Sequence, residues 1–139
     1  MNKSMRMFGL LLVGMAAGCS SNPVASNPAQ APAASRDAAD RAYLLDSAAA
    51  DFHEHGPATS GFRKVRYGVV ETAGGGGMAI LCGEFHTAEK PEEWTKFATL
   101  RTSKYEQWIG DKGFCERPAF GWDADDLSTE LQKRLDALK

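Results

Sequence analysis

The sequence predicts an α+β domain of two layers, in which an N-terminal and a C-terminal helix cover one face of an antiparallel sheet of about four strands, braced by one disulfide. Three observations carry this prediction. Apolar residues recur at helical spacing near both ends of the folded part, strands with alternating side chains lie between them, and Cys82 and Cys115 form an even pair of cysteines.

The first helix is expected to begin at Ser35, because serine is a good N-cap residue. The apolar residues that follow lie three or four positions apart, on one stripe of a helix: Ala38, Ala42, Leu45, Ala49 and Phe52. Gly56 and Pro57 predict the end of this helix, with Gly56 as a left-handed cap and Pro57 as the stop.

The first two strands form a predicted hairpin. The segment Phe62–Val70 alternates, with Val65, Tyr67 and Val69 on one face and Lys64 and Arg66 on the other. Four glycines at 74–77 form the tip, and Met78–His86 is the second strand. A phosphate-binding loop would need a helix after these glycines, so a hairpin tip is the better interpretation.

Two further strands and a helix complete the predicted domain. The strands are Lys96–Thr102 and Tyr105–Ile109, separated by a weak turn. Asp125 is expected to cap the final helix. Its apolar stripe consists of Leu127, Leu131, Leu135 and Leu138.

The first 18 residues predict a lipoprotein signal peptide. Lys3 and Arg6 precede an apolar run at 7–17 that is too short to cross a bilayer as a helix, which needs about 20 residues. The segment Ala16-Ala17-Gly18-Cys19 resembles the lipobox of bacterial lipoproteins. The resemblance implies cleavage before Cys19 and acylation of that cysteine, with palmitate among the attached chains. An ordinary secretory signal and an uncleaved anchor are the alternatives.

Residues 19–35 are expected to form the acylated Cys19 and a flexible tether, and residues 36–139 a single domain. The tether after Cys19 consists of Ser, Asn, Pro, Ala, Gln and Val, without charge or aromatic residues. Loss of Lys3 and Arg6 takes the formal net charge from −2 to −4. That charge argues against nucleic acid and against adhesion to anionic headgroups, so Cys19 is the expected membrane contact.

Cys82 and Cys115 are the two cysteines of the predicted domain. In an oxidising envelope an even number of cysteines favours a disulfide over metal ligation or redox chemistry. By resemblance to enterobacterial lipoproteins, Ser20 after the acylated Cys19 implies sorting to the outer membrane, facing the periplasm.

Two segments of the core resemble a group of small bacterial envelope proteins with a Pro-x-Ser-Ala-x-Phe segment followed by a Cys-Gly-x-Val-Asn strand. These segments are Pro57–Arg63 and Leu81–His86, followed by Trp94 and Phe97. The resemblance covers roughly residues 45 to 110. It implies a fold and a compartment and no activity.

The histidines are the weak candidates for a metal site. His53 and His55 are two positions apart on a predicted helix, so their side chains diverge, and His86 lies on the second strand. We therefore expect no cofactor and no metal. Cys82, Glu84 and His86 share one strand face, but a disulfide removes the thiolate that a Cys–His catalytic pair needs.

Aromatic residues are dense in the second half of the chain, and most are expected in the core: Trp94, Phe97, Trp108, Phe114, Phe120 and Trp122. Trp94 and Trp122 lie beside acidic residues and polar turns. They are the candidates for exposed interface residues.

The sequence therefore favours a membrane-anchored envelope lipoprotein whose domain is not an enzyme and binds another envelope protein. An inhibitor or immunity-type protein is a specific version of this hypothesis. The alternatives are a periplasmic domain that binds a small molecule or a metal, and a structural component of the envelope.

Overall fold

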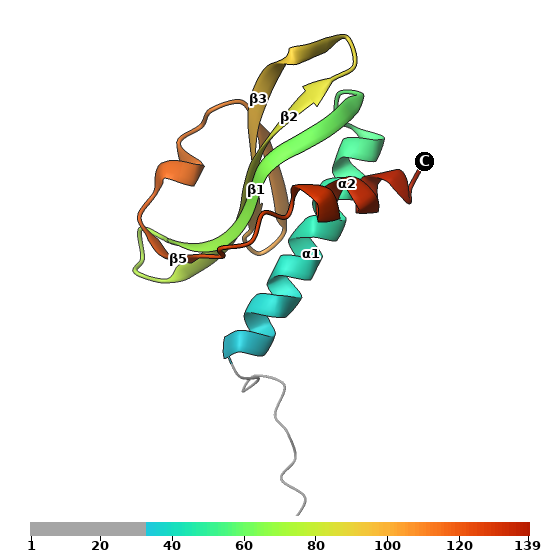
Figure 1. The fold of residues 1–139 in the computed structure, drawn as a ribbon. Coiled ribbons are helices and arrows are strands. Elements are labelled where there is room, and N and C mark those ends of the chain that lie inside the picture. The colour runs from blue at the N-terminus through green and yellow to red at the C-terminus, as the bar shows by residue number, and fades with distance from the viewer. Residues whose placement is uncertain (1–32) are drawn as a thin grey trace, which may run out of the picture. The chain divides into compact units, whose positions relative to one another are not determined.

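The computed structural model describes residues 33–139 and confirms the α+β class. Helix α1 spans Ala33–Glu54 and helix α2 spans Ser128–Asp136. Five antiparallel strands form one sheet in the order β4-β3-β2-β1-β5 (Figure 1). The predicted signal peptide, Cys19 and the tether before Ala33 lie outside the described residues. Within residues 33–139, no helix is long and apolar enough to span a membrane.

The strands are longer than the sequence pattern indicates. Their bounds are Thr59–Glu71 for β1, Gly77–Thr87 for β2, Lys90–Arg101 for β3, Tyr105–Ile109 for β4 and Ala119–Trp122 for β5. Strand β5 was not predicted, because four residues after a proline are too short to show an alternating pattern. The first half of β3 was missed because its polar residues resemble a loop.

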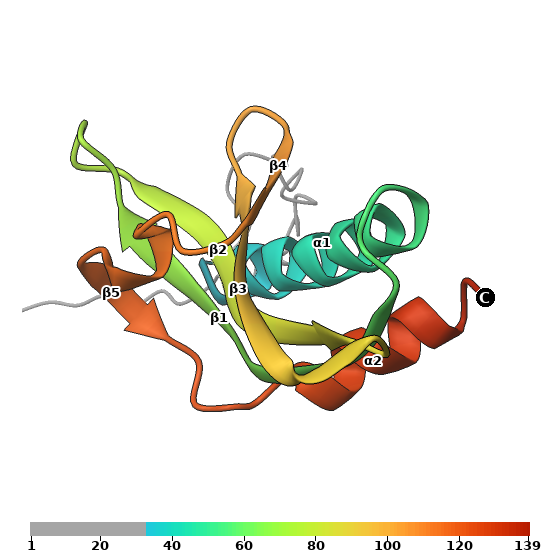
Figure 2. The ribbon, with the colours of Figure 1, turned by 90° about the horizontal axis from the view of Figure 1, so that it is seen from above.

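The two helices cover one face of the sheet, as expected (Figure 2). Leu45, Ala49 and Phe52 of the predicted α1 stripe are buried, whereas Ala38 is exposed and Ala42 is half-buried. The buried helix residues pack against Leu81, Phe97 and their neighbours on the sheet. We call this the helix-covered face and its opposite the open face.

The ends of α1 differ from the prediction. The helix begins at Ala33, two residues before Ser35, because Ala33 and Ala34 have high helix propensity and extend it. Gly56 is not in the left-handed conformation, which in the described chain is found at Gly75, Gly110 and Gly113 among the glycines. A Cβ at Gly56 would lie 2.8 Å from the Phe52 Cα, so close packing explains the glycine.

Asp125 does not cap helix α2, whose N-cap position is Leu127, without a side-chain cap. The Asp126 Oδ1 instead accepts a hydrogen bond of 2.9 Å from the N–H of Ser128, the first residue of the helix. Leu127, Leu131 and Leu135 are buried as predicted, but Leu138 lies beyond the helix and is 45% exposed. The helix is too short to bring Leu138 back to the sheet.

A smaller apolar cluster lies on the open face, beneath the one-turn helix η2 (Phe114–Glu116). It includes Val70, Ile80 and Leu100 of the sheet. The disulfide between Cys82 and Cys115 is confirmed and joins η2 to β2. Residues 110–118 are thereby held against the sheet, and the rest of the open face has no helix over it.

Candidate functional site

The register of the sheet determines which side chains share the open face. Glu84 pairs with Arg63 on β1 and with Lys96 on β3, and Cys82 pairs with Arg66 and Ala98. Because directly paired residues point to the same face, these rows lie side by side across the sheet. The prediction that Cys82, Glu84 and His86 share a face is consistent with this register.

Trp94 lies on this face, and the side chain of Arg63 from β1 covers its ring. The Arg63 guanidinium is 4.2 Å from the centre of the indole ring, and the His86 ring meets the indole edge-on at 4.5 Å between centroids. Arg63 also donates a hydrogen bond to Glu84. Trp94 is half-buried and held on two sides, so its position is restricted before any ligand arrives.

Trp122 is likewise covered by an arginine, further along β1. The Arg66 guanidinium is 4.0 Å from the centre of the Trp122 ring, and Trp122 lies opposite Gly68. A Cβ at Gly68 would lie 2.5 Å from the indole, so only glycine lets the ring lie flat on β1. Both tryptophans predicted as interface residues therefore lie on the open face, each under an arginine from β1.

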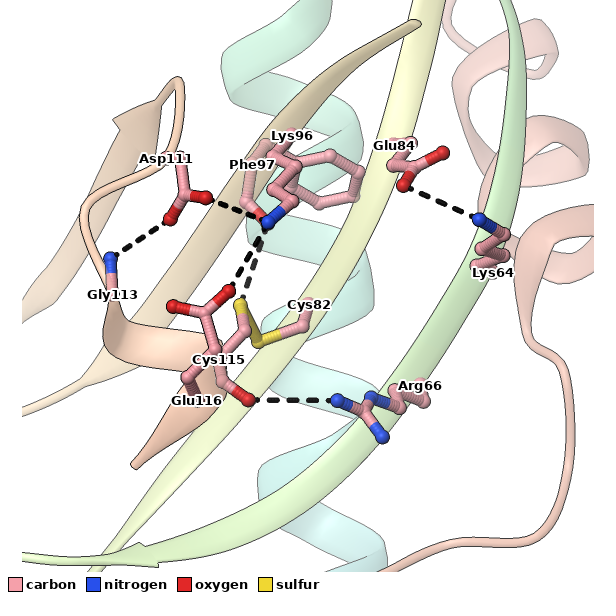
Figure 3. A network of polar contacts seen from close by, with 10 residues as sticks. All are labelled: Lys64, Arg66, Cys82, Glu84, Lys96, Phe97, Asp111, Gly113, Cys115 and Glu116. Atoms are coloured by element: carbon pink, nitrogen blue, oxygen red, sulfur yellow. Dashed lines mark hydrogen bonds and ion pairs between the residues drawn. A yellow bond between two sulfur atoms is a disulfide. The ribbon is translucent and has the colours of Figure 1, made fainter. Parts of the chain in front are cut away.

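A hollow of about 400 Å³ lies between these two pairs. Its lining comes from β1, β2, β3, η2 and the segment 123–126, and includes Lys64, Arg66, Glu84, Lys96, the disulfide and Asp125. Figure 3 shows this centre: the Arg66 guanidinium lies 3.5 Å from the Cys115 carbonyl oxygen, to which it donates, beside the sulfur bridge.

Glu84 is the most enclosed charge of the hollow, with 16% of its side chain exposed. Burial opposes its ionisation, but hydrogen bonds and charges from Arg63 and Lys64 outweigh burial and hold the pKa of the carboxyl below its ordinary value. Lys64 adopts a positive φ of 53° at a β-bulge between Arg63 and Arg66. The bulge places Lys64 where its Nζ lies 3.5 Å from Glu84 Oε1.

Lys96 joins β3 to the loop that carries η2 (Figure 3). Its Nζ lies 2.6 Å from Asp111 Oδ2 and 3.1 Å from Glu116 Oε1. The hydrogen bonds that Lys96 donates to these two carboxylates raise the pKa of Lys96, and the Lys96 and Gly113 donors lower the pKa of Asp111. This network and the disulfide attach the loop to the sheet at two points.

The histidines are not assembled into a metal site in the described chain. His53 and His55 are exposed at the end of α1, with His55 Nδ1 3.4 Å from Asp51 Oδ1, whereas His86 contacts Trp94 on the open face. Within residues 33–139, no group of three or more His, Cys, Asp or Glu side chains is placed to hold a metal ion. Cys82 and Cys115 are joined, so neither supplies a thiolate.

The expectation that most of the dense aromatic residues are in the core is wrong. Of the six, Phe97 is buried, whereas Trp108 is 40% and Phe120 is 64% exposed. Trp94, Phe114 and Trp122 are half-buried. The core aromatic cluster instead joins Phe97 to Phe52, Phe62 and Phe85.

Arg63 and Arg66 were not predicted as site residues. Simple alternation places Arg63 on the face opposite to Arg66, and the bulge between them brings both to the open face. Because Trp94 and Trp122 lie far along the chain, only the folded register shows the pairing. Comparison of the chain with protein-family models, curated proteins and solved structures finds no match to any of the three.

Proposed function

We propose that this chain is a lipid-anchored lipoprotein of the bacterial envelope whose domain is not an enzyme and binds another protein through the open face of its sheet. The observation that supports this most is the pair of arginine-capped tryptophans, Trp94 under Arg63 and Trp122 under Arg66. Both pairs flank a hollow on the sheet face that the helices leave uncovered.

These residue types suit protein recognition. Tryptophan and arginine are the residues that most often contribute large binding energies at protein interfaces, and they do so when packed in place beforehand. Here each indole has a cation over its ring, and Glu84 neutralises Arg63. A partner would therefore meet side chains that are already held in place, at little cost in side-chain entropy.

The anchor is the second part of the proposal. Cys19 would carry the acyl chains, including palmitate, and the uncharged tether would hold the domain away from the headgroups, on the periplasmic side of the outer membrane. Tethering concentrates the domain at the membrane, which suits an inhibitor or immunity-type protein that meets a toxic enzyme there. The net charge of −4 favours a partner with a basic surface.

Capture from envelope extract tests the binding role. The chain without its signal, with Cys19 replaced by serine so that it is soluble, should recover a stoichiometric protein partner across several salt concentrations. The double variant Trp94→Ala, Trp122→Ala should lose this partner. The matched control is Tyr43→Ala, which removes an arginine-capped aromatic from α1, on the other side of the molecule. Recovery of no partner by the parent chain would refute the proposal.

The hollow itself favours a second candidate, a site for a small polar molecule. Its volume of about 400 Å³ and its mixture of cations and carboxylates fit a small ligand with both charges. Native mass spectrometry of gently purified protein distinguishes this candidate, because a retained ligand adds a fixed mass that should be lost in Arg66→Ala.

A further inference from the structure

A groove lies on the edge of the sheet, away from the open face. It runs between the start of β1 and helix α2 and has a volume of about 560 Å³. The strand side consists of Ser60, Gly61 and Phe62, and the helix side of Ser128, Thr129, Gln132, Lys133 and Asp136. Strand β5 pairs with β1 only at Gly68–Val70, so it does not reach this part of the edge.

The register shows where the backbone of Phe62 points. The Gly110 N–H donates to the Lys96 carbonyl, so the polar groups of Lys96 face β4. Backbone directions alternate along a strand, and those of antiparallel neighbours correspond, so Glu84, opposite Lys96, faces β1. Arg63, opposite Glu84, then faces β2, and the N–H and C=O of Phe62 point away from the sheet.

The bulge at Lys64 shifts the alternation by one residue, and beyond it the outward groups are those of Val65 and Tyr67. The carbonyls of Val65 and Tyr67 point outward, where they accept hydrogen bonds from the N–H groups of Leu127 and Asp123. The segment before α2 thus covers the β1 edge down to Val65. The backbone N–H and C=O of Phe62 have no such partner among residues 33–139. Unpaired backbone groups on a strand edge are a template for another strand.

The helix side of the groove adds two features. The Gln132 Oε1 is buried and has no donor among the residues described, so an entering N–H would satisfy it. Lys133 is exposed on the same helix face, and no carboxylate lies within ion-pair distance of it in the described chain. Asp136, its neighbour on this face, is already bound by Lys139 at 2.7 Å.

We propose that this groove binds an extended segment of a partner protein, which adds as a strand beside β1 and presents an acidic side chain to Lys133. The occupant is a strand because Phe62 offers one N–H and one C=O in strand geometry, and a helix has no free backbone groups to match them. The site is separate from the open face, so it stands or falls independently of the function proposed above.

A second strand edge, on β3, suits this role less. Strand β4 pairs with β3 only from Phe97 onward, so the earlier residues of β3 have no strand on that side, but they include Pro91, Glu92 and Glu93. Proline and charged residues on an edge are the devices by which proteins avoid strand addition. The β1 edge carries Thr59, Ser60 and Gly61 before Phe62, none of them charged or proline, and has a helix wall beside it.

The test uses the chain without its signal and a phage-displayed library of ten-residue peptides as the probe. Selected peptides should bind the parent chain at least about tenfold more tightly than Thr129→Trp, because the indole fills the groove. Thr129→Val is the matched control and should bind as the parent does. Lys133→Glu should weaken the binding of peptides with an acidic residue and is the second variant if Thr129→Trp does not fold.

Backbone readouts identify strand addition. Methylation of alternate peptide nitrogens should abolish binding, and the Phe62 amide should gain protection from hydrogen exchange when peptide is bound. Peptides that bind Thr129→Trp equally well, or that protect Trp94 instead of Phe62, would overturn the proposal. Protection of the Phe62 amide in the absence of peptide would also overturn it. Protection that rises with protein concentration would indicate a second copy as the occupant, and protection that disappears when residues 20–32 are deleted would indicate the tether.

Discussion

At the scale of single residues, Lys64 is the one non-glycine residue of the described chain with a positive φ. A side chain in the left-handed region costs about 1 kcal/mol relative to glycine. Lys64 is 69% exposed, and its ion pair with Glu84 contributes little. Lys64→Gly should therefore raise the free energy of unfolding by about 0.5–1 kcal/mol, measured by urea denaturation.

Lys64→Ala is the control for this prediction. It removes the lysine but keeps a Cβ at the strained position, so it should be no more stable than the parent chain. Equal stability of the alanine and glycine variants would show that the bulge is not strained at Lys64.

Glu84 gives the domain a predicted pH dependence. Arg63 and Lys64 hold its pKa in the folded state below the ordinary value of 4.5. A depressed pKa stabilises the folded state above 4.5, and this stabilisation is lost as the pH falls through the folded pKa. The difference in unfolding free energy between the parent and Glu84→Gln should therefore be largest near pH 7 and shrink toward pH 3. A difference that stays constant over this range would contradict the role of Glu84.

The sequence reaches some residues of the site and not others. Trp94 and Trp122 were predicted as exposed interface residues from their polar and acidic neighbours, and both are half-buried on the open face. The cysteine pair follows from the compartment and an even count. The arginine caps could not be predicted, because Arg63 and Arg66 find their tryptophans through strand register. The cap predicted at Asp125 was wrong, since the helix starts two residues later than expected, with Leu127 at its N-cap position.

At the scale of elements, the disulfide decides whether η2 stays on the open face. It closes a loop of 33 positions, which corresponds to about 3–4 kcal/mol of stability in the chain-entropy model. The double variant Cys82→Ala, Cys115→Ala should lose about that much in urea denaturation. It should also be cut faster by trypsin at Lys112, while Lys133 in α2 is cut at the parent rate.

Ion pairs alone are the alternative anchor for this loop. If Lys96, through Asp111 and Glu116, held η2 without the disulfide, tryptic cleavage at Lys112 would be unchanged in the double variant. That outcome would show that the disulfide contributes stability without positioning the loop.

Elements were predicted best where their pattern is long. The stripe of α1 and the β1–β2 hairpin recur over enough residues for periodicity to be visible. Strand β5 has four residues and β3 begins with Lys90, Pro91 and two glutamates, so neither has an apolar alternation to detect. Both were ordered by tertiary pairing rather than by local sequence.

At the scale of the whole molecule, the helix-covered face holds the main core. The proposed function assigns recognition to the open face and membrane attachment to the tether. The class of the fold was predictable because both helices and the hairpin show their periodicity. Which sheet face stays uncovered could not be predicted, since it depends on the face against which the helices pack. The core cluster around Phe97 leaves the opposite face, with Trp94 and Trp122, free for a partner.

The most direct test of the central claim is the dissociation constant of the captured envelope partner for the parent chain and for Trp94→Ala, Trp122→Ala. Each indole should contribute about 1.5 kcal/mol or more, so the double variant should bind at least about 100-fold more weakly, with unchanged circular dichroism. Tyr43→Ala should bind as the parent does. Equal affinity of the double variant and the parent chain would contradict the claim that the open face binds the partner.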